Sequence, residues 1–191
     1  KSMESFIRLG NIHKTDPWDG IILGGSNMSH SKRDKMLFDC IRTMIAARSH
    51  FPRAPTLGIC FGMQTLAEAF GGRVKRLKSA RGAPPTDLNR PVLDGWKQVT
   101  LDTQSCPIFQ GLATPTLMKH YNSDVVKDIP PGFRSVGQSA EYDVVAIEAK
   151  DHLVWGVQFH PELSGKDGMK IIDNFLKVCG TVNNIKNQEH H

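Results

Sequence analysis

The sequence predicts an α/β domain in which helices flank a mainly parallel central sheet, with antiparallel strands added in the second half. Three observations predict this fold class. In the first half, short apolar runs alternate with stretches of helical periodicity. In the second half, β-type runs follow one another without a helix between them, and a last helical stretch closes the chain. The length of 191 residues suits one domain.

The first predicted strand is the apolar run at residues 20–23, which stops at the turn formed by Gly24 and Gly25. Before this strand, residues 3–9 fit a short helix. After it, residues 31–49 carry apolar side chains at every third or fourth position, which is the spacing that gives a helix one apolar face. The order at the start of the chain is therefore strand and then helix.

The same order repeats directly afterwards. Residues 56–60 form a second apolar run, and residues 62–70 have helical periodicity that ends at Gly71 and Gly72. Strands that alternate with helices are expected to be parallel, because each helix carries the chain back across the sheet. The runs GIIL and LGIC contain no polar residue, so we expect both strands to be buried on both faces.

The second half of the chain predicts antiparallel strands and a closing helix. Residues 167–178 have one apolar face, and Gly180 is predicted to end this helix. We expect residues 1–180 to form the domain, with residues 181–191 as a tail that ends in a purification-tag remnant. The short β-type runs before the helix, separated by Pro, Gly and Asp turns, are 97–101, 117–121, 133–139, 144–150 and 154–160.

Composition excludes several classes of protein. The four cysteines are widely spaced and form no Cys-x-x-Cys pair or Cys/His cluster, so we expect no metal site and no cofactor. No apolar run approaches the roughly 18 residues of a membrane span, and the N-terminus lacks a secretory pattern. We therefore expect a cytoplasmic protein without a membrane partner. The net charge of +5 says little about function.

Residues 72–94 form the least regular stretch and are rich in Lys and Arg. Two interpretations stay open: a solvated surface loop, or a docking surface for an acidic partner protein or a phosphate-bearing substrate. Aromatic residues do not interleave with these basic residues, and the chain has no groove-entering motif. We therefore expect no nucleic acid partner.

The most informative segment is Gly-x-Cys-x-Gly at residues 58–62, on the junction between a predicted strand and a predicted helix. Two glycines at this spacing allow a sharp turn that exposes the middle side chain, as in a nucleophile elbow. Cys60 would lie at a helix N-terminus, where the helix dipole favours a thiolate. The backbone N–H of Phe61 could hold an oxyanion in the same space. The alternative is that Cys60 is a small buried residue at the end of a strand.

A nucleophilic cysteine needs a base, and the segment GVQFHPE supplies His160 at the end of a predicted strand. Side chains two residues apart in an extended chain point to the same side, so Glu162 can reach the imidazole. Such a contact fixes the tautomer of the ring and stabilises the imidazolium. The sequence thus predicts a relay of nucleophile, base and orienting carboxylate in Cys60, His160 and Glu162.

The motifs LGICFGMQ and GVQFHPE, about a hundred residues apart, resemble those of class I (triad-type) glutamine amidotransferase domains. The resemblance extends from about Trp18 to Gly180 and implies a flavodoxin-like three-layer fold. Among subfamilies, the segments CPIFQGL and NFLxxCG are most similar to the glutaminase domain or subunit of GMP synthetase. The family has a further strand and helix near its start, so its first strand is expected to be missing from this chain.

The resemblance implies that glutamine is hydrolysed to glutamate and ammonia through a thioester on Cys60. It implies a partner, a synthetase subunit or domain that accepts the ammonia, because the chain has no phosphate-binding loop of its own. It gives the second oxyanion-hole N–H to Gly25. The substrate-binding residues that it implies are Gly24, Gly25, Gln64, Tyr121, Asn122 and Ser123, with Asn122 at a position where the family often has histidine.

Two alternatives remain. A free-standing γ-glutamyl peptide or amide hydrolase would use the same three residues on a larger substrate. A non-catalytic regulatory subunit would keep the fold without the reaction. Cysteine reactivity separates this last interpretation, because an activated Cys60 should alkylate faster near neutral pH than Cys40, Cys106 and Cys179.

Overall fold

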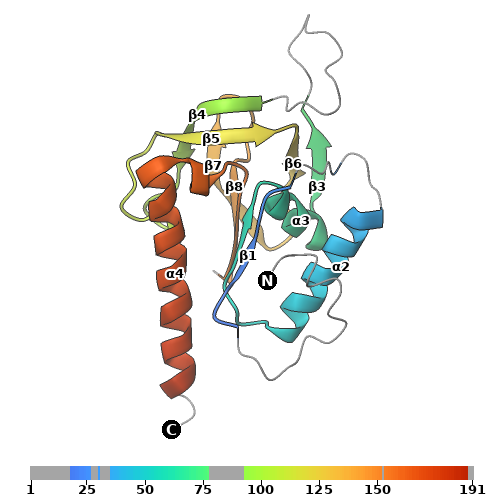
Figure 1. Ribbon diagram of the computed structural model, residues 1–191, viewed down its shortest axis with the longest axis vertical. Coiled ribbons are helices and arrows are strands. Elements are labelled where there is room, and N and C mark those ends of the chain that lie inside the picture. The colour runs from blue at the N-terminus through green and yellow to red at the C-terminus, as the bar shows by residue number, and fades with distance from the viewer. Residues whose placement is uncertain (1–17, 27–29, 31–34, 78–92, 152, 189–191) are drawn as a thin grey trace, which may run out of the picture.

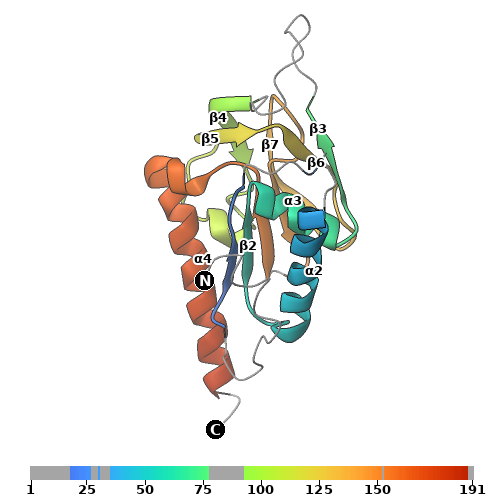
Figure 2. The ribbon, with the colours of Figure 1, turned by 45° about the vertical axis from the view of Figure 1, so that its right-hand side comes forward.

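A computed structural model describes residues 18–26, 30, 35–77, 93–151 and 153–188. Most of its strands form one sheet of seven, in the order β1-β2-β9-β8-β7-β4-β5. Helix α4 covers one face of this sheet, and helices α2 and α3 lie on the opposite side (Figures 1 and 2). The predicted α/β class, with helices on both faces of the sheet, is confirmed.

The element boundaries follow the sequence pattern closely in most places. The helices are α2 (Lys35–His50), α3 (Phe61–Ala69) and α4 (Gly165–Gln188), with short 3₁₀ helices η2 (Pro107–Phe109) and η3 (Pro161–Leu163). The strands of the large sheet are β1 (Ile21–Leu23), β2 (Thr56–Ile59), β4 (Leu93–Leu101), β5 (Thr116–Asn122), β7 (Phe133–Ser139), β8 (Ala146–Ala149) and β9 (Val154–Val157). The helix predicted at residues 3–9 lies outside the described residues.

The sheet is mixed, and its two kinds of pairing separate cleanly. Strands β1, β2 and β9 pair in parallel. Strands β9, β8, β7, β4 and β5 pair antiparallel, as predicted for the second half. Within the described residues the parallel part is thus smaller than predicted. The reason is that only α2 makes a short crossover between neighbouring parallel strands, whereas the chain beyond α3 turns back mainly through hairpins.

Strand β1 differs from the prediction that it is buried on both faces. Ile21 and Leu23 pack against the inner faces of α2 and α3 in one apolar cluster, but Ile22 is 48% exposed. Strand β1 lies at the edge of the described sheet, and α4 covers the neighbouring strands instead. The other prediction holds, because every residue of β2 is buried.

The stretch at residues 72–94 contains strand structure that the sequence did not reveal. Strand β3 (Arg73–Arg76) pairs antiparallel with β6 (Asp124–Asp128) to form a separate two-stranded sheet. Three of the four residues of β3 are basic, and only Val74 is apolar at its half-buried positions, so its apolar signal is weak. The rest of the basic loop, residues 78–92, lies outside the described residues, and its role is untested.

Helix α4 also runs further than predicted, because Gly180 does not end it. A Cβ added at Gly180 would meet nothing within 4 Å, and the position is exposed. The flanking helical residues therefore tolerate this glycine in the helix interior. The predicted tail at residues 181–191 is helical as far as Gln188.

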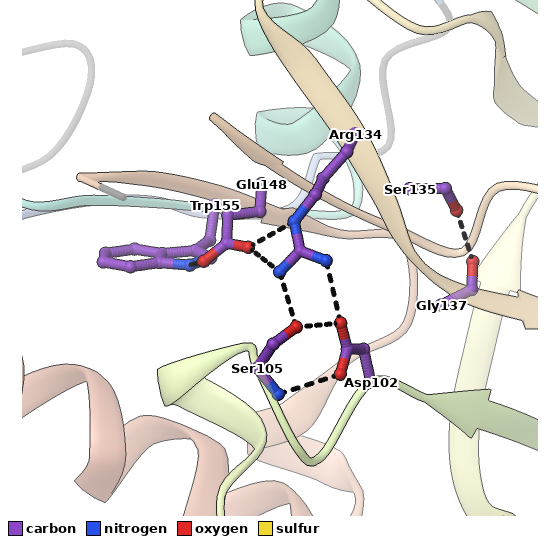
Figure 3. A network of polar contacts seen from close by, with 7 residues as sticks. All are labelled: Asp102, Ser105, Arg134, Ser135, Gly137, Glu148 and Trp155. Carbon is purple, nitrogen blue, oxygen red and sulfur yellow. Dashed lines mark hydrogen bonds and ion pairs between the residues drawn. The ribbon is translucent and has the colours of Figure 1, made fainter. Parts of the chain in front are cut away.

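A closed polar network ties β7, β8 and β9 to the loop after β4 (Figure 3). The Glu148 carboxylate is fully buried and accepts hydrogen bonds from Trp155 Nε1 at 2.9 Å and from the Arg134 guanidinium. Arg134 also donates to Asp102 at 2.8 Å and to Ser105 at 3.0 Å. Hydrogen bonds from Ser105, and then Arg134, lower the pKa of Asp102 to about 2 against a smaller opposing effect of burial. The buried carboxylate of Glu148 is thus hydrogen-bonded at both oxygens and paired with the Arg134 cation.

Candidate active site

Cys60 lies at the junction of β2 and α3, as predicted, and its backbone has an unusual conformation. Its φ of 53° and ψ of −108° place it outside the helix, and it is the single non-glycine residue with positive φ in the described part of the chain. Its N–H donates to the Val157 carbonyl of β9 at 2.7 Å, and its carbonyl accepts from Gln64 N at 3.2 Å. The surrounding hydrogen bonds therefore hold a strained turn in place.

The two glycines of the turn are required by close backbone packing. A Cβ at Gly62 would lie 2.1 Å from the Leu23 carbonyl oxygen, and a Cβ at Gly58 would lie 2.7 Å from the Gly62 carbonyl. Real side chains do not approach backbone this closely. Glycine at both positions thus lets α3 start directly against β1 and turn Cys60 out of the strand.

His160 and Glu162 follow the end of β9 and form a close pair. His160 Nδ1 lies 2.7 Å from Glu162 Oε1. The imidazole is mostly buried, with 13% of its side chain exposed, whereas Glu162 is 43% exposed. The Nε2 atom of His160 is buried and has no hydrogen-bond partner among the described residues. One ring nitrogen is therefore held by the carboxylate and the other remains available.

The electrostatics favour a protonated imidazole. The Cys60 side chain, and then Glu162, raise the pKa of His160 from 6.5 to about 10. Burial is the largest single influence on the pKa of Glu162 and acts to raise it. The hydrogen bond from His160, a backbone hydrogen bond and the charge of His160 together outweigh burial, and the net shift is downward. Both shifts favour the charged pair of imidazolium and carboxylate.

Strand β5 lies at the edge of the sheet and contacts both residues. The His160 N–H donates to the Lys119 carbonyl at 2.8 Å, and the Cys60 thiol approaches the Tyr121 carbonyl at 3.8 Å. Lys119 N–H donates in turn to Ser164 Oγ at 2.9 Å. The strand therefore forms one wall of the site, with the Tyr121 side chain exposed on its outer face.

The turn after β1 forms the opposite wall. A Cβ at Gly25 would lie 2.9 Å from His160 Cε1 and 3.6 Å from Cys60 Cβ, so this backbone passes close to both residues. Gly24 is different, because nothing lies within 4 Å of an added Cβ. Phe61 is the first residue of α3, where backbone N–H groups have no partner within the helix. The structure thus brings Gly25 and Phe61 to the nucleophile but does not bring Gly24 against it.

The predicted substrate-binding side chains are less uniform. Gln64 is buried and donates from Nε2 to the Asp124 carbonyl at 2.6 Å and to Gln158 Oε1 at 3.1 Å, so its amide N–H groups are already bonded. Asn122 Nδ2 donates to the same Asp124 carbonyl at 3.3 Å, and its Oδ1 is buried without a partner among the described residues. The Ser123 carbonyl accepts from Leu77 N at 2.7 Å.

Sequence reasoning missed Gln158 as a member of this site. Its side chain is fully buried, and Nε2 lies 3.6 Å from Cys60 Sγ. Gln158 thus connects the thiol to Gln64 on α3. Its position two residues before His160 was the available signal, since both side chains leave an extended chain on the same side.

No group of three or more His, Cys, Asp or Glu residues in the described ranges could hold a metal ion. The described helices also include none that is long and apolar enough to cross a membrane.

The family model for class-I glutamine amidotransferases matches residues 7–179, and the chain belongs to that family. In this chain the fold presents a strained cysteine at a strand–helix junction and a histidine–glutamate pair just beyond the end of the neighbouring strand β9.

Relatives similar to this chain include GMP synthases. A glutamine-hydrolysing GMP synthase of Thermus thermophilus is 37% identical over 127 residues, which cover 66% of this chain and 22% of the relative. One of Helicobacter pylori is 33% identical over 181 residues, which cover 91% of this chain and 30% of the relative. The chain therefore spans less than a third of the length of these relatives, and it is a glutamine amidotransferase domain similar to their glutaminase portion.

A solved structure gives the same answer for the fold. A candidate GMP synthase subunit from Thermoplasma acidophilum superimposes with a TM-score of 0.73 at 25% identity. The match covers 90% of this chain and 78% of that protein.

Proposed function

We propose that this chain is a glutaminase that hydrolyses glutamine to glutamate and ammonia and passes the ammonia to a synthetase such as GMP synthetase. The observation that carries the proposal is the strained Cys60 turn beside His160, whose Nδ1 is held 2.7 Å from Glu162. These three residues supply a nucleophile, a base and a carboxylate that orients the base.

The first half of the reaction forms a thioester. The Cys60 proton passes to His160, whose raised pKa favours the imidazolium, and the thiolate sulfur attacks the carbon of the side-chain amide. The negative charge that develops on the amide oxygen is stabilised by the backbone N–H groups of Gly25 and Phe61. His160 then gives its proton to the leaving nitrogen, and the C–N bond breaks to release ammonia.

The second half returns the enzyme to its starting state. His160 takes a proton from water, which attacks the thioester carbon, and glutamate leaves as the C–S bond breaks. Glu162 acts throughout by stabilising the imidazolium and fixing its orientation, as the raised pKa of His160 and the lowered pKa of Glu162 suggest. The backbone of β5 at Tyr121, Asn122 and Ser123, together with Gln64 and the Gly24–Gly25 turn, would hold the glutamine.

The partner follows from what the domain lacks. Ammonia needs an activated acceptor, and the sequence has no phosphate-binding loop that could activate one. The relatives named GMP synthase are more than three times as long as this chain's match to them. A separate synthetase subunit or domain is therefore the proposed partner. The four cysteines are free in the structure, which suits a reducing compartment such as the cytoplasm.

The test is glutamate release from glutamine by the purified chain, alone and with a GMP synthetase domain that lacks its own glutaminase. We expect glutamate release that is lost in Cys60→Ala and kept in the matched control Cys179→Ala. Cys179 lies on α4, and its side chain packs in the main apolar cluster. Faster turnover of a γ-glutamyl dipeptide than of glutamine would favour the free-standing hydrolase. An absence of release under every condition would favour a regulatory subunit.

A further inference from the structure

A buried histidine–tyrosine pair lies behind the wall of the candidate site and belongs to none of the roles above. His120 is fully buried, and its Nδ1 lies 2.9 Å from the hydroxyl of Tyr142. Tyr142 is 8% exposed and packs in the main apolar cluster together with Cys60 and Phe159. A buried polar pair of this kind is costly unless it fixes a specific arrangement.

His120 stands between the two residues of β5 that contact the catalytic pair. The Lys119 carbonyl accepts from the His160 N–H at 2.8 Å, and the Tyr121 carbonyl faces the Cys60 thiol at 3.8 Å. Side chains alternate along a strand, so the His120 side chain enters the core while its neighbours' side chains face outward. Any shift of His120 therefore moves both carbonyls.

The other partners of His120 are themselves fixed. Its ring packs edge-on against Phe159, the residue before His160, with ring centroids 6.0 Å apart. Tyr142 is anchored in the turn between β7 and β8, where its N–H donates to Ser139 Oγ at 3.3 Å and its carbonyl accepts from Ser139 N at 3.2 Å. The hydroxyl of Tyr142 thus offers a rigid point of attachment.

Strand β5 needs such an attachment because it is the last strand of the sheet and pairs only with β4 among the described strands. We propose that the His120–Tyr142 hydrogen bond is a positioning contact, which fixes the outer edge of β5 that both Cys60 and His160 contact. His120 and Tyr142 act through β5 and touch no reacting atom. This inference rests on the proposed function for its effect on turnover, but its effect on the thiol can be measured separately.

The experiment compares Tyr142→Phe and His120→Leu, which remove the hydrogen bond, with His120→Asn, which keeps a polar atom near the Nδ1 position. The matched control is Thr116→Val, which removes the 2.7 Å hydrogen bond from Thr116 Oγ1 to Asp167 at the far end of the same strand. For each full-length variant, one measures the rate of Cys60 alkylation by iodoacetamide at neutral pH, kcat and KM for glutamine, and the denaturation midpoint.

We expect Tyr142→Phe and His120→Leu to slow Cys60 alkylation about 3- to 10-fold, the change in rate that corresponds to one buried hydrogen bond. The same variants should lower kcat more than they raise KM. His120→Asn should restore much of the alkylation rate. Thr116→Val should lower the denaturation midpoint without slowing alkylation.

The inference is overturned if Tyr142→Phe alkylates at the wild-type rate, or if Thr116→Val slows alkylation equally. It is also overturned if His120→Asn is as slow as His120→Leu, since the polar contact then has no part in the effect. Alkylation needs no glutamine. If no protein hydrolyses glutamine while the alkylation rates differ as expected, the proposed function fails and the positioning contact stands.

Discussion

Two polar clusters stand near opposite ends of β9, and they are built differently. Near the start of the strand, Trp155 joins the network of Glu148, Arg134, Asp102 and Ser105, in which the buried carboxylate is bonded by Trp155 and Arg134 (Figure 3). Beyond its end, the site around Cys60 keeps buried polar atoms that have no hydrogen-bond partner among the described residues, namely His160 Nε2 and Asn122 Oδ1.

The difference separates a cluster that stabilises the fold from one that is arranged for a ligand. Buried polar groups in folded proteins are nearly always paired, so unpaired ones gather where another molecule or water completes them. The same strand therefore supports both clusters, but only one of them has bonding capacity left over. Mutations should affect stability at one end of β9 and turnover at the other.

The largest effect is expected from His160→Gln. It removes the base, so kcat for glutamine should fall about 10²- to 10⁴-fold, the range for loss of a general base. The free energy of unfolding should change by only about 1 kcal/mol, because a single hydrogen bond to Glu162 is weakened. Steady-state kinetics and urea denaturation of the same sample measure both quantities. A large loss of stability with unchanged kcat would reverse the assignment of the two clusters.

The next effect is expected from Arg134→Met, which leaves the buried Glu148 carboxylate without its cation. Removing one partner of a buried ion pair costs about 3–5 kcal/mol, and partial exposure of the arginine lowers this to about 2–3 kcal/mol. Urea denaturation measures the loss, and the Cys60 alkylation rate should stay unchanged. The matched control is Arg73→Met, since the Arg73–Asp128 pair is exposed and should contribute less than about 1 kcal/mol. Equal losses in the two variants would contradict the closed network.

A smaller effect is expected far from both clusters, at Gly180 in α4. Gly180→Ala should increase the free energy of unfolding by about 0.8–1 kcal/mol, because alanine loses less backbone entropy in a helix and meets no neighbour within 4 Å. Neither alkylation nor turnover should change. A loss of stability in thermal denaturation would mean that α4 ends at Gly180 after all.

The smallest effect is the pH dependence of the His160–Glu162 pair. The pKa of His160 is raised to about 10, so its contribution to stability is complete below pH 6.5 and is lost as the pH rises through 10. The pKa of Glu162 is lowered, so its contribution is present above pH 4.5 and is lost as the pH falls. The stability difference between wild type and Glu162→Gln should therefore be largest near pH 5–6.5, at below about 1 kcal/mol because Glu162 is partly exposed.

Denaturation of both proteins at a series of pH values checks this window. A difference that grows between pH 7 and 10 would have the wrong sign for an imidazolium stabilised by a carboxylate.

Local patterns predicted the parts of this molecule that depend on nearby residues. The strand–turn–helix at Cys60 follows from the steric demand at Gly58 and Gly62, which any chain with this spacing must satisfy. The antiparallel strands of the second half were also predictable from the sequence, because turn residues separate short β-type runs.

Features that depend on distant residues were not predictable in this way. Strand β3 has basic side chains and is stabilised by pairing with β6, some fifty residues away, so its own pattern carries little signal. The Gln158 contact to Cys60 and the His120–Tyr142 pair arise only when separate strands assemble. Helix α4 continues through Gly180 because the flanking residues outweigh the low helix propensity of one glycine.

The most direct test of the central claim is covalent labelling by a glutamine-mimicking electrophile at pH 7, followed by peptide mapping of all four cysteines. We predict label on Cys60 and none on Cys40, Cys106 or Cys179. Burial raises the pKa of the Cys106 thiol well above its usual range and that of Cys179 to about 11, so both remain protonated. Labelling of Cys60 should be lost in His160→Gln. Equal labelling of the four cysteines, or labelling of Cys60 that is unchanged in His160→Gln, would contradict a Cys60–His160 active site.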